Sequence, residues 1–137
     1  MTAPFARFKS GDFDGLLDVE KLRNWLDGQG VEPGADLAVR RISGGMSNES
    51  IGVERNGRRF VLRRPAKIAL EGADRGMERE FRMLRALEGT DVPHPPPVAL
   101  CSDREVIGSA FYLMGHVDGF TSLQPLPRQV VVMLFHD

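Results

Sequence analysis

The sequence predicts an α+β fold in which helices cover a five-stranded antiparallel sheet. Three observations lead to this prediction. Apolar and polar residues alternate in three successive segments between residues 37 and 64, as they do in half-buried strands. Two other segments, residues 18–28 and 77–87, repeat their apolar residues at helical spacing. Two short apolar stretches, residues 98–101 and 110–117, follow the second helix and have the length of strands.

The first predicted element is a helix over residues 18–28. The apolar residues that define its buried face are Val19, Leu22, Trp25 and Leu26. The side chain of Asp18 can cap its amino end, and Gly28 or Gly30 can end it in the left-handed conformation. Residues 1–15 contain no continuous apolar stretch, and we expect them to form a mobile leader.

Three strands follow and are predicted to form an antiparallel meander. They cover residues 37–42, 47–55 and 58–64, and a glycine-rich turn joins the first two. Asn56-Gly57 joins the second and third strands. This pair is typical of two-residue hairpins, because both residue types tolerate a positive φ.

A second and longer helix is predicted from the apolar residues at positions 77, 81, 84 and 87. Gly89 is placed to end it. The proline-rich residues 93–97 cannot be helical and are expected to form an extended connector. This connector leads into the last two predicted strands.

Composition limits the classes of function that this chain can have. Its 137 residues fit one domain with a substantial core. The 18 Lys and Arg residues nearly balance 19 Asp and Glu, whereas a dedicated nucleic-acid-binding protein is strongly basic. Cys101 is the one cysteine, which excludes an intrachain disulfide and a cysteine zinc cluster. No apolar stretch approaches the roughly 20 residues that span a bilayer. We therefore expect a cytoplasmic protein without nucleic-acid or membrane partners and without a metal site.

One acidic residue lies within the apolar face of the second helix. At about 100° per residue, Glu80 falls inside the arc of apolar side chains. A carboxylate is costly to bury unless a cation pairs with it, and Arg63 or Arg64 on the third strand could do so. The alternative is that Glu80 lies at the edge of the arc and reaches solvent.

The strands also carry many arginines, which could suggest a basic patch. Strand alternation distributes them over both faces of the sheet, so we expect solvated surface residues and one phosphate-binding residue. These arginines are Arg40, Arg41, Arg55, Arg58, Arg59, Arg63 and Arg64.

A glycine-rich turn at residues 43–48, an arginine near a strand end (Arg63) and a glutamate on the next helix (Glu80) follow one another in the chain. This ordered set resembles the small lobe of protein-kinase-like phosphotransferases. It resembles in particular the aminoglycoside-phosphotransferase-like family of small-molecule kinases, in the branch related to the kinase-like domain of acyl-CoA dehydrogenase fusion proteins. The resemblance covers residues 16–120. The other segments that carry it are residues 60–65, 78–87, 90–93, 107–114 and 117–119.

The resemblance implies that the chain binds ATP, with the glycine-rich turn over the phosphates. Glycine lets the backbone approach closely, and hydroxyl and amide groups can donate to phosphate oxygens. The residues of this turn are Ser43, Gly44, Gly45, Met46, Ser47 and Asn48. Arg63 would hold the α- and β-phosphates where protein kinases use lysine, and Glu80 would orient Arg63 through an ion pair. A planar guanidinium and a lysine ammonium differ in binding geometry.

The resemblance also implies a pocket for the adenine base. Val61, on the same strand face as Arg63, would help to form its roof, and Met114 would lie at its back. The backbone of Gly115, His116 and Val117 would form the hinge that hydrogen-bonds the purine edge. An acidic residue is expected where this chain has Gly115.

The implied parent activity is Mg²⁺-dependent transfer of the ATP γ-phosphoryl group to a hydroxyl of a small molecule. Its base-positioning and metal-binding residues belong to a large helical lobe. We find no such residues in the sequence, and we expect a nucleotide-binding lobe at residues 16–120 that is inactive by itself. Residues 121–137 would form an atypical tail with six consecutive apolar residues at 130–135.

Two alternatives remain open. In the first, the chain is a non-catalytic module that self-associates, or pairs with a large lobe or another partner, through the apolar tail. In the second, the chain is a truncated gene product. An exposed apolar stretch of this kind would promote aggregation.

Overall fold

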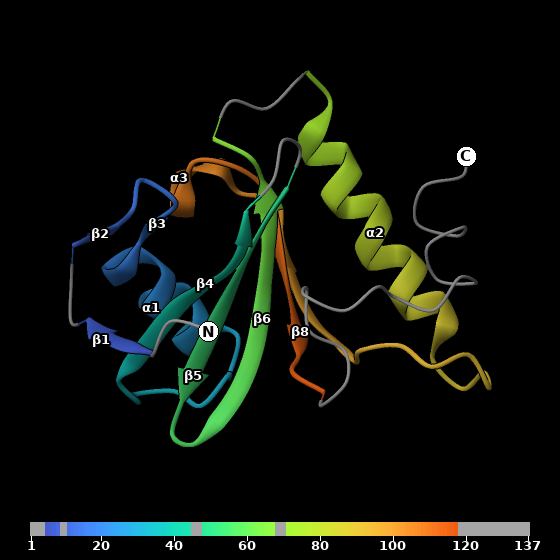
Figure 1. The fold of residues 1–137 in the computed structure, drawn as a ribbon, viewed down its shortest axis with the longest axis horizontal. Coiled ribbons are helices and arrows are strands. Elements are labelled where there is room, and N and C mark those ends of the chain that lie inside the picture. Colours follow the sequence, from blue (N-terminus) through green and yellow to red (C-terminus); the bar gives the residue numbers. More distant parts are fainter. Residues whose placement is uncertain (1–4, 9–10, 45–47, 68–70, 118–137) are drawn as a thin grey trace.

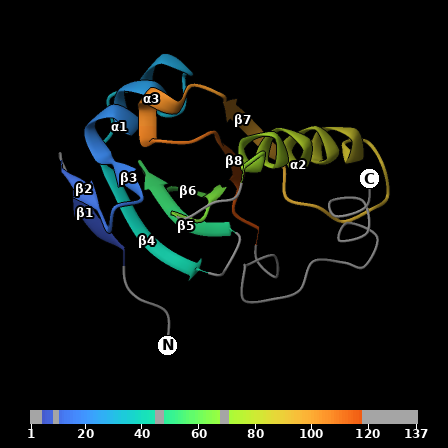
Figure 2. The same cartoon turned by 90° about the horizontal axis from the view of Figure 1, so that it is seen from above.

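The computed structural model describes residues 5–8, 11–44, 48–67 and 71–117. Within these residues the chain forms a six-stranded antiparallel sheet in the order β1-β4-β5-β6-β8-β7, a small β2-β3 ribbon and three helices. Helices α1 and α3 lie together on one side of the sheet, and α2 lies on the other side (Figures 1 and 2). The predicted α+β class is confirmed.

The predicted helices and strands occur in the predicted order, and the structure adds the strands β1, β2 and β3 and the helix α3. The main sheet consists of β1 (Ala6–Phe8), β4 (Leu37–Gly44), β5 (Asn48–Arg55), β6 (Arg58–Pro65), β7 (Pro97–Cys101) and β8 (Phe111–Gly115). The ribbon consists of β2 (Asp12–Phe13) and β3 (Leu17–Asp18). The helices are α1 (Val19–Gly28), α2 (Ala73–Leu87) and α3 (Arg104–Ile107).

The sheet has one strand more than the five predicted. The additional strand, β1, pairs antiparallel with β4 from Ala6 opposite Val39 to Phe8 opposite Leu37. Three residues are too few for an alternation pattern to be recognised in the sequence. By pairing with β4, this strand satisfies backbone groups along an edge that would otherwise be open.

The local signals at the ends of the elements are confirmed. The Asp18 side chain accepts a hydrogen bond from the backbone of Lys21 at 3.0 Å and so caps α1. Gly30, two residues after α1, has a φ of 75°. Asn56 and Gly57 have φ values of 51° and 79° and join β5 to β6 as a tight hairpin.

Two hydrophobic clusters hold the layers together. The larger lies between α1, α3 and one face of the sheet, and it includes Leu22 of α1, Val53 of β5 and Leu62 of β6. The smaller joins α2 to the opposite face, where Tyr112 of β8 packs near Phe81. Because side chains alternate along strands, the residues between those of the larger cluster point to the α2 side. We call this side of the sheet the α2 face. Among its residues are Arg40, Ser50, Gly52, Arg59, Val61, Arg63, Tyr112 and Met114.

The expectation that the strand arginines other than Arg63 are solvated is wrong for two of them. Arg55 is fully buried, and it donates to the backbone oxygens of Val31 and Ala35 and to Asp27. Arg64 is 6% exposed, and its guanidinium donates to the backbone oxygens of Leu16, Pro65 and Ile107. Apart from the Asp27 carboxylate and the adjacent Pro65, these acceptors are backbone carbonyl groups of distant segments, which become partners only when the layers pack together.

Candidate functional site

Arg63 and Glu80 form an ion pair on the α2 face. Nη2 of Arg63, from β6, donates to Oε1 of Glu80, from α2, at 3.1 Å. Glu80 is 4% exposed, so the alternative in which it reaches solvent is wrong. The Arg63 side chain keeps 19% of its surface exposed. The predicted contact is therefore present, with the arginine open to a ligand on one side.

Two residues that the sequence analysis missed complete this cluster. The hydroxyl of Tyr112 donates to the same Glu80 oxygen at 2.8 Å, and Nη1 of Arg63 donates to Oγ of Ser50 at 3.1 Å. Ser50 and Tyr112 are the neighbours of Arg63 on the two strands that flank it, β5 and β8. Strand alternation already places Tyr112 on the same face as Met114. Its nearness to Glu80 becomes apparent only when the register between β6 and β8 is known.

The electrostatics of the cluster shift the pKa values of two of its members, Tyr112 and Arg63. Burial is the main reason that the pKa of the Tyr112 hydroxyl is raised, and the neighbouring Glu80 adds to the effect. Burial works against the charged form of Arg63, but its interactions with Tyr112 and Glu80 outweigh this and raise its pKa. Tyr112 is thus a neutral hydrogen-bond donor near neutral pH, and Arg63 is a permanent cation.

The predicted phosphate-binding turn is described only in part. Ser43 and Gly44 end β4, and Asn48 begins β5. Ser43 pairs with Ser50, the residue that contacts Arg63. Gly45, Met46 and Ser47 lie outside the described residues. The turn is therefore anchored beside Arg63, and its role stays a prediction.

The predicted base-pocket residues are neighbours on the α2 face. Val61 of β6 pairs with Met114 of β8 on one side and with Gly52 of β5 on the other. Met114 is partly buried against the smaller hydrophobic cluster. Val61 is 2% exposed. The structure brings these residues together, and their contact with a base stays a prediction.

The predicted hinge has fewer available donors than expected. The backbone N–H of Gly115 donates to the Pro96 oxygen at 2.8 Å, and that of His116 donates to the Arg59 oxygen at 3.1 Å. A purine would therefore have to use the N–H of Val117 or the carbonyl groups of this segment.

Close packing explains why glycine occupies position 115. A Cβ atom built on Gly115 would lie 2.8 Å from Cγ of Pro96, which is shorter than a van der Waals contact. The rigid proline ring cannot move aside as a flexible side chain could. The acidic residue expected at this position would collide with the proline-rich connector.

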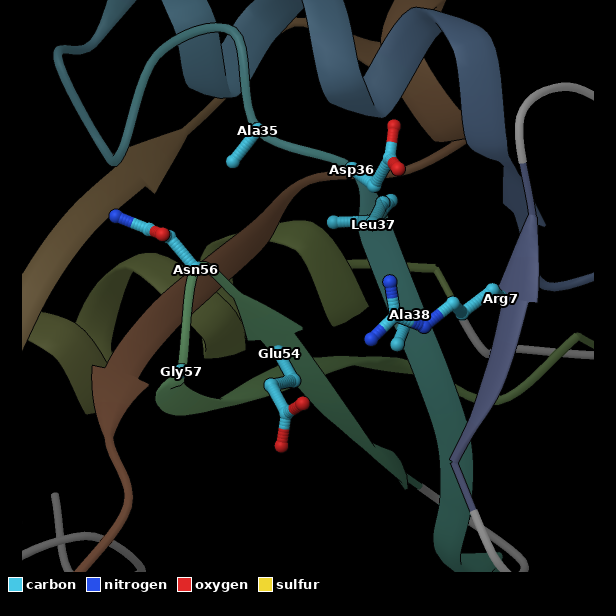
Figure 3. Close-up of a pocket in the computed structure, with 8 residues that line it drawn as sticks. All are labelled: Arg7, Ala35, Asp36, Leu37, Ala38, Glu54, Asn56 and Gly57. Carbon is cyan, nitrogen blue, oxygen red and sulfur yellow. The ribbon is translucent and has the colours of Figure 1, made fainter.

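Two of the cavities in the described part of the chain border the sheet, and none of the predicted site residues lines either of these two. One, of about 390 Å³, lies between β1, β4 and the β5–β6 hairpin, with Arg7, Asp36 and Glu54 around it (Figure 3). The other, of about 550 Å³, lies between the end of β6 and the start of α2, next to Lys67 and Arg104. Each of these cavities is lined by both positively and negatively charged side chains.

Within the described ranges, no group of three or more His, Cys, Asp or Glu side chains could hold a metal ion. No helix in the same part of the chain is long and apolar enough to cross a membrane.

Comparison with known proteins gives consistent matches. Acyl-CoA dehydrogenase family member 11 of Gallus gallus is 36% identical over 94 residues, which cover 69% of this chain and 12% of that protein. The Homo sapiens protein of the same name is 35% identical over 107 residues, covering 78% of this chain and 14% of that protein. The chain thus spans about an eighth of the length of these relatives.

A solved structure shares the fold. It is the crystal structure of a proposed aminoglycoside phosphotransferase from Ralstonia eutropha, with a TM-score of 0.60 and 38% sequence identity. The match covers 75% of this chain and 29% of the solved chain. Residues 38–134 match the phosphotransferase enzyme family, which is well over half of the sequence. The fold, the positions of Arg63 and Glu80 on the α2 face and these matches lead to the same family. The chain belongs to the phosphotransferase enzyme family.

Proposed function

We propose that this chain is the nucleotide-binding part of a small-molecule kinase that transfers the ATP γ-phosphoryl group to a hydroxyl. One observation supports this most directly: the buried Arg63–Glu80 pair between β6 and α2, in a chain of the phosphotransferase enzyme family. A cation fixed by a buried carboxylate is ready to receive a polyphosphate without rearranging.

Arg63 would hold the phosphates of ATP through donors that the protein leaves available. An arginine has five N–H groups, and in the described part of the chain two of these donate to Ser50 and Glu80. The remaining donors can form a planar fork, which suits two phosphate oxygens. The turn at residues 43–48 would cover the phosphates from the opposite side with backbone N–H groups.

The base would bind on the same face, near Val61 and Met114, with the backbone of the segment from Gly115 to Val117 at its edge. Transfer also requires a group that positions the acceptor hydroxyl and carboxylates that hold Mg²⁺. We propose that these come from another part of a two-lobed enzyme, because the matched family structure is much longer than this chain. Residues 1–137 by themselves would bind ATP without transferring phosphate.

The proposal predicts that Arg63→Ala abolishes most of the ATP binding of the 137-residue chain. Loss of a charged hydrogen-bond donor to phosphate should weaken binding by roughly 10- to 100-fold. Isothermal titration calorimetry with ATP measures this directly. Arg58→Ala is the matched control, because Arg58 lies on the same strand but its side chain is 61% exposed and points to the other face.

Unchanged ATP affinity in Arg63→Ala would contradict the proposal. Absence of ATP binding in the unmodified chain, together with a stable dimer in sedimentation, would instead favour a non-catalytic self-associating module. The apolar tail expected to mediate such association lies outside the described residues.

A further inference from the structure

An aromatic side chain occupies the α2 face beside the predicted base pocket. The ring of Phe5 lies between the guanidinium groups of Arg40 and Arg59, with ring-centroid distances of 4.7 Å and 5.3 Å to their Cζ atoms. Both distances are within the range of about 6 Å over which a cation attracts an aromatic ring. Three residues far apart in the sequence therefore make one aromatic-binding arrangement.

Gly52 forms the floor of this arrangement. A Cβ atom built on Gly52 would lie 3.2 Å from Cζ of Phe5 and 3.1 Å from Cγ of Arg40. Such contacts are tighter than ordinary van der Waals packing. The missing side chain thus lets the tip of the Phe5 ring reach the backbone of the sheet. We call Arg40, Gly52 and Arg59 the ring slot.

The guanidinium groups of the slot are planar and positively charged, and both properties favour binding of an aromatic ring. Nε of Arg59 donates to Glu54 at 3.0 Å, which fixes the orientation of that guanidinium. Nε of Arg40 is buried, and no described residue accepts a hydrogen bond from it. Guanidinium groups stack on nucleic-acid bases in the same way as they stack on aromatic side chains. The slot is thus chemically suited to a purine.

The slot also lies near the predicted hinge and within reach of Arg63. Gly52 pairs with Val61, and the Arg59 oxygen accepts the hydrogen bond from His116 of the predicted hinge. Arg59 and Arg63 lie four residues apart on one strand and on one face, about 13 Å at the usual rise per residue. An extended nucleoside triphosphate can reach from the slot to Arg63.

The part of the α2 face around Gly52 and Val61 is closed in this structure. Val61 is 2% exposed and Gly52 is buried, although a base is expected to stack against this part of the sheet. A purine can reach these residues only if a side chain that covers them moves. Phe5 is the covering ring that contacts Gly52, and it is only half-buried itself.

We propose that the ring slot is the purine subsite and that Phe5 fills it in the absence of nucleotide. This inference rests on the proposed function. Nucleotide binding exchanges one ring for another between Arg40 and Arg59, so the segment that carries Phe5 competes with ATP. The apparent affinity is reduced by the fraction of molecules in which the slot is occupied.

The test compares two ligands, ATP and inorganic tripolyphosphate, by calorimetry on the full chain. Phe5→Ala removes the competing ring and should tighten ATP binding by roughly tenfold, the value of two cation–π contacts. Tripolyphosphate has no base, and its affinity should not change. Phe5→Leu keeps an apolar side chain without a π face and should give an intermediate gain.

The arginines are tested in the Phe5→Ala background, where no ring competes. There, Arg59→Ala should weaken ATP binding several-fold and leave tripolyphosphate binding unchanged. Arg58→Ala is the control, because Arg58 is the neighbouring residue and lies over Phe60 at 5.1 Å on the other face. Circular dichroism verifies that each variant is folded.

Each outcome is decisive for the slot. Unchanged or weaker ATP binding in both Phe5 variants overturns it, as does equal loss of ATP and tripolyphosphate in Arg59→Ala. No ATP binding in either the original chain or Phe5→Ala also overturns it. A failure of the proposed function gives a different result. In that case Arg63→Ala would leave tripolyphosphate binding intact, and this result would be the same with or without the Phe5 ring.

Discussion

At the scale of single residues, one Glu80 oxygen accepts hydrogen bonds from both Arg63 and Tyr112 and so joins α2 to β6 and β8. A buried carboxylate with one partner would keep rotational freedom and an unmet hydrogen-bonding capacity. Two donors, from β6 and β8, fix it in one position. Arg63 is therefore held in place by a residue that need not touch any ligand.

Tyr112 predicts a loss of stability at alkaline pH. In the folded chain its pKa is raised, so it stays protonated after the same residue in the unfolded chain begins to ionise near pH 10. The unfolded state alone then releases a proton. The free energy of unfolding should fall above about pH 10, by up to about 1.4 kcal/mol per pH unit, until the folded tyrosine also ionises.

Denaturant unfolding between neutral and alkaline pH measures this loss, and Tyr112→Phe should lack the tyrosine contribution to it. Tyr112 is the one tyrosine of the sequence, so tyrosinate absorbance reports its ionisation without overlap. A Tyr112 that ionises in the folded chain like a free tyrosine would contradict the prediction.

At the scale of elements, glycines have opposite effects in different backbone conformations. Gly57 forms the β5–β6 hairpin with a φ of 79°, a conformation that costs other residues energy. Gly76 lies within α2 without a positive φ, and a Cβ atom built on it would meet no atom within 4 Å. The first glycine is required by its turn, whereas the second only weakens its helix.

This difference predicts changes of opposite sign for the same substitution. Gly76→Ala should raise the free energy of unfolding by about 0.5–1 kcal/mol, because alanine favours the helix. Gly57→Ala should lower it by about 1–2 kcal/mol, because of backbone strain at positive φ. Chemical denaturation of the two variants measures both values. Equal effects would show that backbone conformation does not govern these positions.

At the scale of the whole molecule, two buried arginines tie the helical layer to the sheet. Arg55 joins β5 to Asp27 of α1 and to the loop that follows it, and Arg64 joins β6 to Leu16 and to the end of α3. Hydrogen bonds from the Gly34 N–H and from Arg55 lower the pKa of Asp27. These arginines stabilise the packing of the layers through hydrogen bonds to backbone carbonyl groups and, for Arg55, to the Asp27 carboxylate.

Arg55→Met should therefore destabilise the fold and leave the nucleotide site unaffected. It removes three hydrogen bonds and leaves the buried oxygen of Val31 and the partly buried oxygen of Ala35 without this donor, for a loss of about 2–4 kcal/mol. Thermal unfolding measures the loss, and Arg58→Met, at an exposed position, should change stability by less than about 0.5 kcal/mol. Weakened ATP binding by the folded Arg55→Met chain would contradict this separation of roles.

Elements that are marked by local sequence patterns could be predicted from the sequence. The Asp18 cap, the Asn56-Gly57 hairpin and the apolar arc of α2 each depend on a few neighbouring residues. The interactions that stabilise them are therefore local in the sequence. A cationic partner for Glu80 could also be predicted, because burying a carboxylate requires a cation. The residue pattern left Arg63 and Arg64 as candidates, and only the family resemblance singled out Arg63.

The contacts between distant segments became apparent only in the tertiary structure. The β1 strand, the Tyr112 and Ser50 contacts, the burial of Arg55 and Arg64 and the Phe5 ring on Gly52 all depend on strand register and layer packing. No short stretch of sequence contains both partners of such a contact. Their energies arise only when the sheet and helices assemble, which is the physical reason that residue patterns could not reveal them.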